Sequence, residues 1–177
     1  EHDYDGVNEN VLVDVPWKGQ TRHALLHPDR NGYVYLMDRT TGEVLSANPF
    51  VHITTSRQVN LSNGSLEHVS EKTPEIGKVV REICPASPGG KDWQPSSFSP
   101  RTGLLYIPHQ NLCEDEEGLE ANYIAGTPYV GMNVRMYAGP GGHRGELTAW
   151  DPIAARPAWK LTEKYPVWSG TLVTAGD

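Results

Sequence analysis

The sequence predicts an all-β protein, and three observations carry that prediction. Glycine and proline are frequent, with 18 and 14 copies in 177 residues, and they are scattered along the whole chain. No amphipathic stretch keeps a helical period for more than about ten residues. Short segments of alternating apolar and polar residues recur instead, each bounded by turn residues. Strands joined by tight turns satisfy all three observations.

The first strand-turn-strand unit occupies residues 24–46. An apolar segment at 24–27 leads into a turn at 28–32, and residues 33–38 alternate as a strand does. Asn-Gly at 31–32 and Thr-Gly at 41–42 provide the positive φ angles that tight hairpins require. The sequence therefore predicts consecutive antiparallel strands in this region.

The same unit recurs at residues 99–108 and again at 145–161. In the last copy a strand ends in Asp151, a turn follows, and the returning strand carries Trp159. Such a unit, repeated at intervals of several tens of residues, is typical of a β-propeller blade. A β-sandwich would show similar alternation, but the pattern favours the propeller.

Two long polar stretches separate these units, at residues 54–78 and 113–144. Both are long for structureless loops in a compact domain, so we expect ordered excursions that serve a function or are pinned by a covalent bond. The second contains an acidic run at 114–117. That run lacks the alternating Asp/Asn and the Gly of a calcium loop, which predicts a solvated surface there.

Charge and hydropathy exclude two classes of partner. The chain has 15 Lys and Arg against 22 Asp and Glu, a net charge of -7, and no basic run, so nucleic acid is not expected. Its apolar runs span only a few residues, whereas a membrane-spanning helix requires about 20. The chain begins without Met and without an apolar leader, and it ends just after an apolar run. We therefore expect a piece of a longer protein.

Two aspartates, Asp3 and Asp5, lie one residue apart near the start of the chain. In an extended segment their side chains share a face, about 7 Å apart, and their charges repel. A hard cation between them, or an arginine such as Arg30 beside them, would convert that repulsion into a binding site. A solvated turn is the alternative, because Asp and Gly also gather in turns for backbone reasons.

The chain has two cysteines, Cys84 and Cys113. An even number does not by itself establish a disulfide bond, so pairing remains open at this point. A disulfide would indicate an oxidising compartment.

Several motifs together closely resemble the quinoprotein alcohol dehydrogenases, the methanol and ethanol dehydrogenase family that uses pyrroloquinoline quinone. The matching blocks occur in the family's order, at residues 3–8, 25–42, 84–95, 111–113 and 167–171. The resemblance implies an eight-bladed β-propeller several hundred residues long. Residues 1–177 would then be a partial propeller domain, covering the middle to later blades with their long loops and truncated at both ends.

The resemblance also implies roles for particular residues. Asp3 matches the catalytic base, and Arg30 matches an arginine that contacts both the quinone and the base. Asp92 and Trp93 match part of the rim of the cofactor site, and Trp168 matches a further cofactor-contacting tryptophan. His2 replaces the tryptophan that normally precedes the base, which puts residues 1 and 2 in doubt as native sequence.

The same resemblance addresses the metal and the cysteines. Asp3 and Asp5 would be metal ligands, with the remaining ligands upstream of Glu1. A second aspartate at the position of Asp5 is typical of lanthanide-dependent members and provides extra negative charge for a trivalent ion; calcium is the alternative. Cys84 and Cys113 match a disulfide pair of the family.

The function implied is oxidation of a primary alcohol to an aldehyde by hydride transfer to the quinone. Electrons would pass to a cytochrome c in the bacterial periplasm, and a homodimer of the full-length protein is a further expectation. The competing hypothesis is a noncatalytic β-propeller scaffold of the bacterial envelope, because the same fold supports both.

Overall fold

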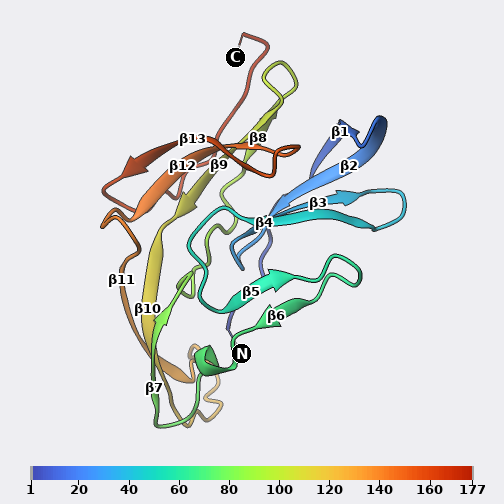
Figure 1. The fold of residues 1–177 in the computed structure, drawn as a ribbon. Helices are drawn as coiled ribbons and strands as arrows, with labels where there is room; N and C mark the ends of the chain where they lie inside the picture. Colours follow the sequence, from blue (N-terminus) through green and yellow to red (C-terminus); the bar gives the residue numbers. More distant parts are fainter. Residues whose placement is uncertain (1, 177) are drawn as a thin grey trace.

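A computed structural model describes residues 2–176, and the regular secondary structure in this part of the chain consists almost entirely of antiparallel strands (Figure 1). Within residues 2–176 the one helical element is a single turn of 3-10 helix, η1 (Ser70–Lys72). The strands are β1 (Val11–Trp17), β2 (Gln20–Pro28), β3 (Tyr33–Asp38), β4 (Val44–Pro49), β5 (Ser56–Val59), β6 (Leu66–His68), β7 (Val79–Ile83), β8 (Ser97–Ser99), β9 (Leu104–Gln110), β10 (Leu112–Gly118), β11 (Met132–Ala138), β12 (Gly145–Asp151) and β13 (Arg156–Glu163). No helix among the described residues is long and apolar enough to cross a membrane.

The first four strands form one sheet in the order β1-β2-β3-β4, each paired with its neighbour in sequence. The predicted hairpins are confirmed. Gly32 has φ +94° in the turn between β2 and β3, and a Cβ atom there would lie 2.8 Å from Cγ2 of Val51. A larger residue is therefore excluded by both backbone conformation and space.

The second four-stranded sheet has the order β13-β12-β9-β8. Between β9 and β12 the chain makes an excursion, the β10–β11 hairpin, and β10 also pairs with β7 to complete a three-stranded sheet. The residue following β9, Asn111, donates its side-chain amide to the carbonyls of Pro140 and His143, at 3.0 and 2.9 Å. These bonds fix the start of the excursion beside its end.

The main core lies between the two four-stranded sheets, and in Figure 1 the sheet of β1 to β4 lies to the right of the sheet of β8, β9, β12 and β13. Phe50, which follows β4, meets His109 of β9 edge to face with ring centroids 5.0 Å apart. The buried members of this core are Val13, Val15, Ala24, Leu26, Val34, Leu36, Leu45, Phe50, Leu105, Ile107 and Trp150. Two separate meanders that share one core are what the sequence predicts for neighbouring blades.

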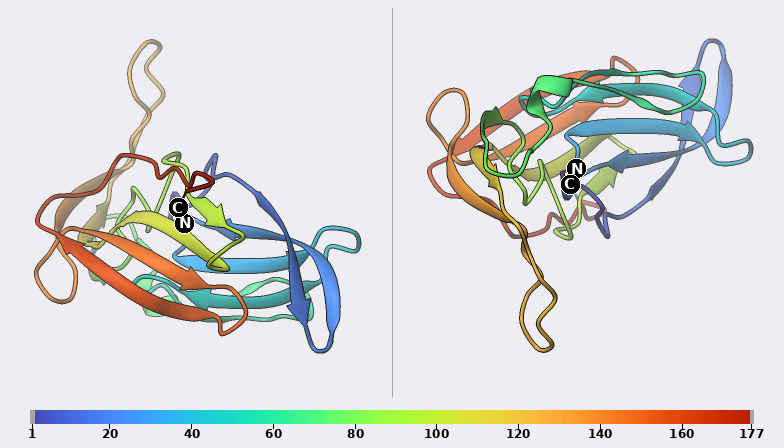
Figure 2. Two further views of the ribbon diagram at one scale, coloured as in Figure 1. Left: turned by 90° about the horizontal axis from the view of Figure 1, so that it is seen from above. Right: turned by 90° about the horizontal axis from the view of Figure 1, so that it is seen from below.

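The two long polar stretches are more regular than loops. Residues 54–78 include β5, β6 and η1, and residues 113–144 include most of β10 and all of β11. The tip of the β10–β11 hairpin projects away from the body of the molecule (Figure 2). Both excursions are ordered, as expected.

Candidate functional site

The segment that carries Asp3 and Asp5 runs extended, with alternate side chains facing opposite ways. Tyr4 packs inward: its ring stacks on His2 with centroids 5.3 Å apart, and its hydroxyl donates to the carbonyl of Pro85 at 2.5 Å. Asp3 and Asp5 are exposed. Buried Asn8 anchors the segment further along by donating to the carbonyl of Pro28 at 2.7 Å.

Arg30 reaches this segment from the turn after β2. Its Nη1 donates to the carbonyl of Asp5 at 2.6 Å, its Nη2 donates to the carbonyl of Ser87 at 2.6 Å, and Nη2 lies 3.7 Å from Oδ2 of Asp3. A Cβ atom at Gly89 would lie 2.8 Å from the Cβ of Arg30, so glycine is required there for the two loops to meet. The structure thus brings together three of the predicted site residues.

The carboxyl groups of Asp3 and Asp5 interact with each other, and this shifts their pKa values in opposite directions. The hydrogen bond with Asp5 is the largest cause that raises the pKa of Asp3, partial burial adds to it, and the charge of Arg30 opposes it. The same hydrogen bond lowers the pKa of Asp5. Two exposed carboxylates in contact are hard oxygen donors that a multivalent cation would hold more favourably than a proton does. The donor set fits a metal, although residues 2–176 contain no group of three or more His, Cys, Asp or Glu arranged to hold one.

The predicted cofactor rim, Asp92 and Trp93, lies in a loop held by an ion pair between buried Lys91 and partly exposed Glu9. Lys91 has no exposed surface, and its Nζ lies 2.6 Å from Oε2 of Glu9 and donates to the carbonyl of Asp92 at 2.9 Å. The negative charge of Asp92 contributes to the raised pKa of Asp3, which places Asp92 near the pair. Trp93 is 57% exposed.

Sequence reasoning missed the ion pair of Glu9 and Lys91. Each residue stands alone among polar neighbours, and their separation of 82 positions leaves no local signal. Only the fold reveals that the pair connects the segment of Asp3 to the loop of Asp92.

Trp168 lies in a segment that packs against the same loop. The carbonyl of Val167 accepts hydrogen bonds from Nε2 of Gln94 at 3.3 Å and of Gln110 at 2.8 Å, and the N–H of Thr171 donates to the carbonyl of Pro95 at 2.9 Å. Trp168 is 42% exposed. No hydrogen bond or ion pair among the described residues joins Trp168 to Asp3 or Arg30, so its predicted role as a cofactor contact stays a prediction.

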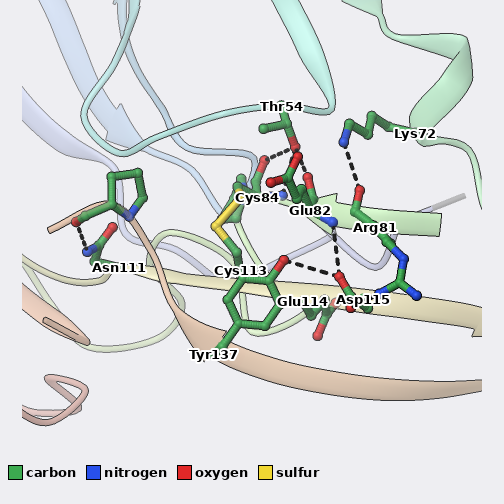
Figure 3. The surroundings of a disulfide bond; sticks show 12 residues. Thr54, Lys72, Arg81, Glu82, Cys84, Asn111, Cys113, Glu114, Asp115 and Tyr137 are labelled. Carbon is green, nitrogen blue, oxygen red and sulfur yellow. Dashed lines mark hydrogen bonds and ion pairs between the residues drawn. A yellow bond between two sulfur atoms is a disulfide. The ribbon is translucent and has the colours of Figure 1, made fainter. Parts of the chain in front are cut away.

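The Cys84–Cys113 disulfide is present and connects β10 to the loop after β7 (Figure 3). The two Cα atoms are 4.5 Å apart. Thr54 lies above the bond: its Oγ1 accepts from the N–H of Cys84 at 2.9 Å and donates to the carbonyl of Glu82 at 2.6 Å. The pairing implied by the family resemblance is confirmed, and it covalently anchors the loop that contacts Arg30.

The prediction that the acidic run is solvated is wrong for two of its four residues. Glu114 is 0% exposed and Glu116 is 2% exposed, whereas Asp115 and Glu117 are partly exposed. Successive side chains of β10 point to opposite faces, so the first and third residues of the run, Glu114 and Glu116, turn inward together. Burial, reinforced by a hydrogen bond with Glu116, raises the pKa of Glu114 to about 7. The alternation of a strand could have predicted two inward-facing side chains, but a run of four acidic residues does not show which of them are buried.

Comparison with known proteins places this fold. No protein-family model matches the chain. Its three-dimensional structure matches that of a europium-containing methanol dehydrogenase with a TM-score of 0.93 and 45% identity, covering 99% of this chain and 31% of that one. The fold is therefore that of a segment of the propeller found in such dehydrogenases, and this match decides between propeller and sandwich.

The sequence relatives agree, and the chain is a homologue of a segment of the quinoprotein alcohol dehydrogenases. It is 45% identical over 177 residues to the lanthanide-dependent methanol dehydrogenase of Methylacidiphilum fumariolicum strain SolV. It is also 38% identical over 184 residues to a quinoprotein ethanol dehydrogenase of Pseudomonas aeruginosa. The alignments cover 98% and 99% of this chain, yet each spans only 29% of the relative.

Proposed function

We propose that the protein containing this chain is an alcohol oxidoreductase, which oxidises a primary alcohol to an aldehyde with pyrroloquinoline quinone and a bound metal ion. The observation that carries the proposal is the convergence of Asp3, Asp5 and Arg30 at one exposed site. The similarity to methanol and ethanol dehydrogenases supports it. A noncatalytic scaffold has no use for a carboxylate pair beside an oriented guanidinium.

Asp3 is the proposed base. When bound, the quinone supplies the hydride acceptor and the metal supplies a Lewis acid. Asp3 takes the hydroxyl proton of the alcohol while the carbon-bound hydrogen leaves as hydride, so that the products are the aldehyde, a proton on Asp3 and the reduced acceptor. The charge of Arg30, 3.7 Å away, favours the ionised form of Asp3 that this step requires.

Asp3 and Asp5 are the proposed metal ligands from this chain, with further ligands upstream of Glu1. Two interacting carboxylates provide more negative charge than a single aspartate, which suits a trivalent lanthanide better than calcium. Calcium is the alternative ion. Arg30, Asp92, Trp93 and Trp168 are the proposed contacts with the quinone, from the two packed loops and the turn after β2.

A cytochrome c is the proposed electron acceptor, since one relative of Methylorubrum extorquens, 35% identical over 185 residues, is named methanol dehydrogenase [cytochrome c] subunit 1. The net charge of -7 suits a basic partner. The disulfide suits the bacterial periplasm. A homodimer of the full-length protein completes the proposal.

The decisive test is alcohol-dependent dye reduction by the full-length protein, purified with quinone and assayed with lanthanum or calcium. We expect turnover with lanthanum, loss of that turnover in Asp5→Ala, and a decrease of about 100-fold or more in Asp3→Asn with the quinone still bound. Asp14→Ala removes an exposed carboxylate on β1 and serves as the control.

Each part of the proposal has its own contrary result. Turnover with calcium alone would refute the lanthanide assignment. Unchanged turnover in Asp3→Asn would remove Asp3 from the role of base. A full-length protein that neither binds quinone nor reduces dye would refute the oxidoreductase proposal and favour the scaffold hypothesis.

A further inference from the structure

The buried carboxyl groups of Glu114 and Glu116 lie side by side on the inner face of β10, behind the proposed site. Figure 3 shows Glu114 next to the disulfide, on the strand that Cys113 ties to the loop after β7. Neither side chain takes part in the proposed chemistry. Burying two carboxyls on one face is costly unless hydrogen bonds compensate, so their partners indicate what they do.

Glu114 accepts two hydrogen bonds from a single residue, Ser87. Its Oε1 accepts from the Ser87 N–H at 2.6 Å, and its Oε2 accepts from the Ser87 hydroxyl at 3.1 Å. Ser87 is also the residue whose carbonyl accepts from Nη2 of Arg30 at 2.6 Å. Two hydrogen-bonded steps therefore connect Glu114 to the guanidinium beside Asp3.

Arg30 depends on this connection for its orientation. Its Nη1 and Nη2 donate to the carbonyls of Asp5 and Ser87, while its buried Nε has no hydrogen-bond partner among the described residues. If the Ser87 carbonyl turned away, one of the two hydrogen bonds that orient the guanidinium would be lost. The disulfide fixes Cys84 three residues before Ser87, but it does not set the direction of that carbonyl.

Glu116 extends the same network toward the start of the chain. Its Oε1 lies 3.6 Å from Nδ1 of His2, whose ring stacks on Tyr4 between the two aspartates. The pair of glutamates thus lies behind both groups that flank Asp3, namely the Arg30 guanidinium and the anchor at Tyr4.

We propose that Glu114, supported by Glu116, is a positioning residue for Arg30: it orients the Ser87 carbonyl and so sets where the guanidinium lies relative to Asp3 and the cofactor. This inference rests on the proposed function. Glutamine at position 114 can replace it, because the amide oxygen accepts from the Ser87 N–H while the amide N–H donates to Glu116. Alanine cannot.

The test compares Glu114→Ala, Glu114→Gln and the control Glu117→Gln in the full-length protein loaded with quinone and lanthanum. Glu117 lies on the same strand, loses the same charge and faces outward. Turnover, the alcohol KM and the absorption band of the bound quinone are measured. We expect Glu114→Ala to lower kcat by about 10-fold or more with little change in KM and to shift the band, because Arg30 no longer holds its position. Glu114→Gln and Glu117→Gln should keep kcat within about 3-fold of the parent.

Unchanged kcat and an unshifted band in Glu114→Ala would overturn the inference, as would an equal loss of kcat in Glu114→Gln. If Glu114→Ala does not fold, the milder Glu114→Asp decides, because its shorter side chain withdraws the carboxylate from the Ser87 N–H: a shifted band supports the inference, and an unshifted band overturns it. A parent protein without alcohol-dependent dye reduction would instead overturn the proposed function, so the two failures are distinguishable.

Discussion

Arg30 is oriented by backbone carbonyls and not neutralised by a close carboxylate. Its two hydrogen bonds go to the carbonyls of Asp5 and Ser87, and the carboxylate of Asp3 is 3.7 Å away. An aspartate bonded bidentately to the guanidinium would neutralise most of its positive charge. Here the positive charge is fixed in direction and remains available to an anionic or polarised ligand, as electrostatic stabilisation requires.

His109 is the residue whose burial has the clearest consequence for stability. It is 0% exposed, its Nε2 lies 2.8 Å from the Thr148 hydroxyl, and burial lowers its pKa from 6.5 to about 4. The folded protein therefore keeps the ring neutral at a pH where the unfolded chain protonates it. As pH falls from about 6.5 toward 4, the unfolded state gains protons that the folded state lacks, and the free energy of unfolding decreases.

We predict that the full-length protein loses about 2 kcal/mol of stability through this residue between pH 7.5 and pH 5. His109→Gln should show a smaller loss over the same range, even though it lowers stability at both pH values. The measurement is thermal unfolding at the two pH values, with His52→Gln, an exposed histidine, as the control. Equal pH dependence in His109→Gln and the parent would contradict the assignment.

At the scale of elements, β10 organises the region behind the site. One face of this strand carries Glu114 and Glu116, which turn inward, and Glu114 contacts the loop of Ser87. The opposite face carries the disulfide partner Cys113 and Asp115, which accepts from the Tyr137 hydroxyl at 3.2 Å and pairs with Arg81 at 3.1 Å (Figure 3). The strand is thus joined to the β7 side by the disulfide and an ion pair, and to β11 by a side-chain hydrogen bond.

Removing the disulfide should loosen this element. The bond closes a loop with a sequence separation of 29 residues, so the chain-entropy model predicts a loss of about 3–4 kcal/mol in Cys84→Ala/Cys113→Ala. Thermal unfolding of the full-length double variant measures this loss. The parent treated with reductant should approach the same midpoint, and an unchanged midpoint in both would show that the folded packing alone holds the loop.

At the scale of the whole molecule, stability comes from packing one four-stranded sheet on the other. Trp150, from β12, is 2% exposed and belongs to the core shared with β1 to β4. Trp159, on the neighbouring strand β13, is 42% exposed, and its ring centroid lies 5.9 Å from that of Tyr106. Substituting each tryptophan in turn therefore compares the contribution of a core residue with that of a surface residue in the same sheet.

We predict that Trp150→Ala lowers the free energy of unfolding by about 3–5 kcal/mol, because it leaves a large cavity between two sheets. Trp159→Ala should cost about 1 kcal/mol, since much of its ring already meets water. Denaturant unfolding of the full-length variants gives both values. Similar losses for the two would mean that the sheets do not depend on this contact.

Most of the strands and their hairpins could be predicted from the sequence, because alternation and turn chemistry act over a few residues. Residues 33–38 and the turn at Gly32 are examples. The family resemblance added the disulfide and the candidate site of Asp3, Asp5 and Arg30. It could not show how Arg30 is held, because the carbonyl of Ser87 is 57 positions away.

By itself, then, the sequence determined an all-β chain with two aspartates and an arginine suited to an anionic, metal-binding site. Only the tertiary structure decided which acidic residues are buried and which buried lysine supports the loop of Asp92 and Trp93. The physical reason is that burial of a charge is decided by what packs over it. Ser87 lies 27 positions from Glu114, and Glu9 lies 82 from Lys91, so those partners meet only when the sheets assemble.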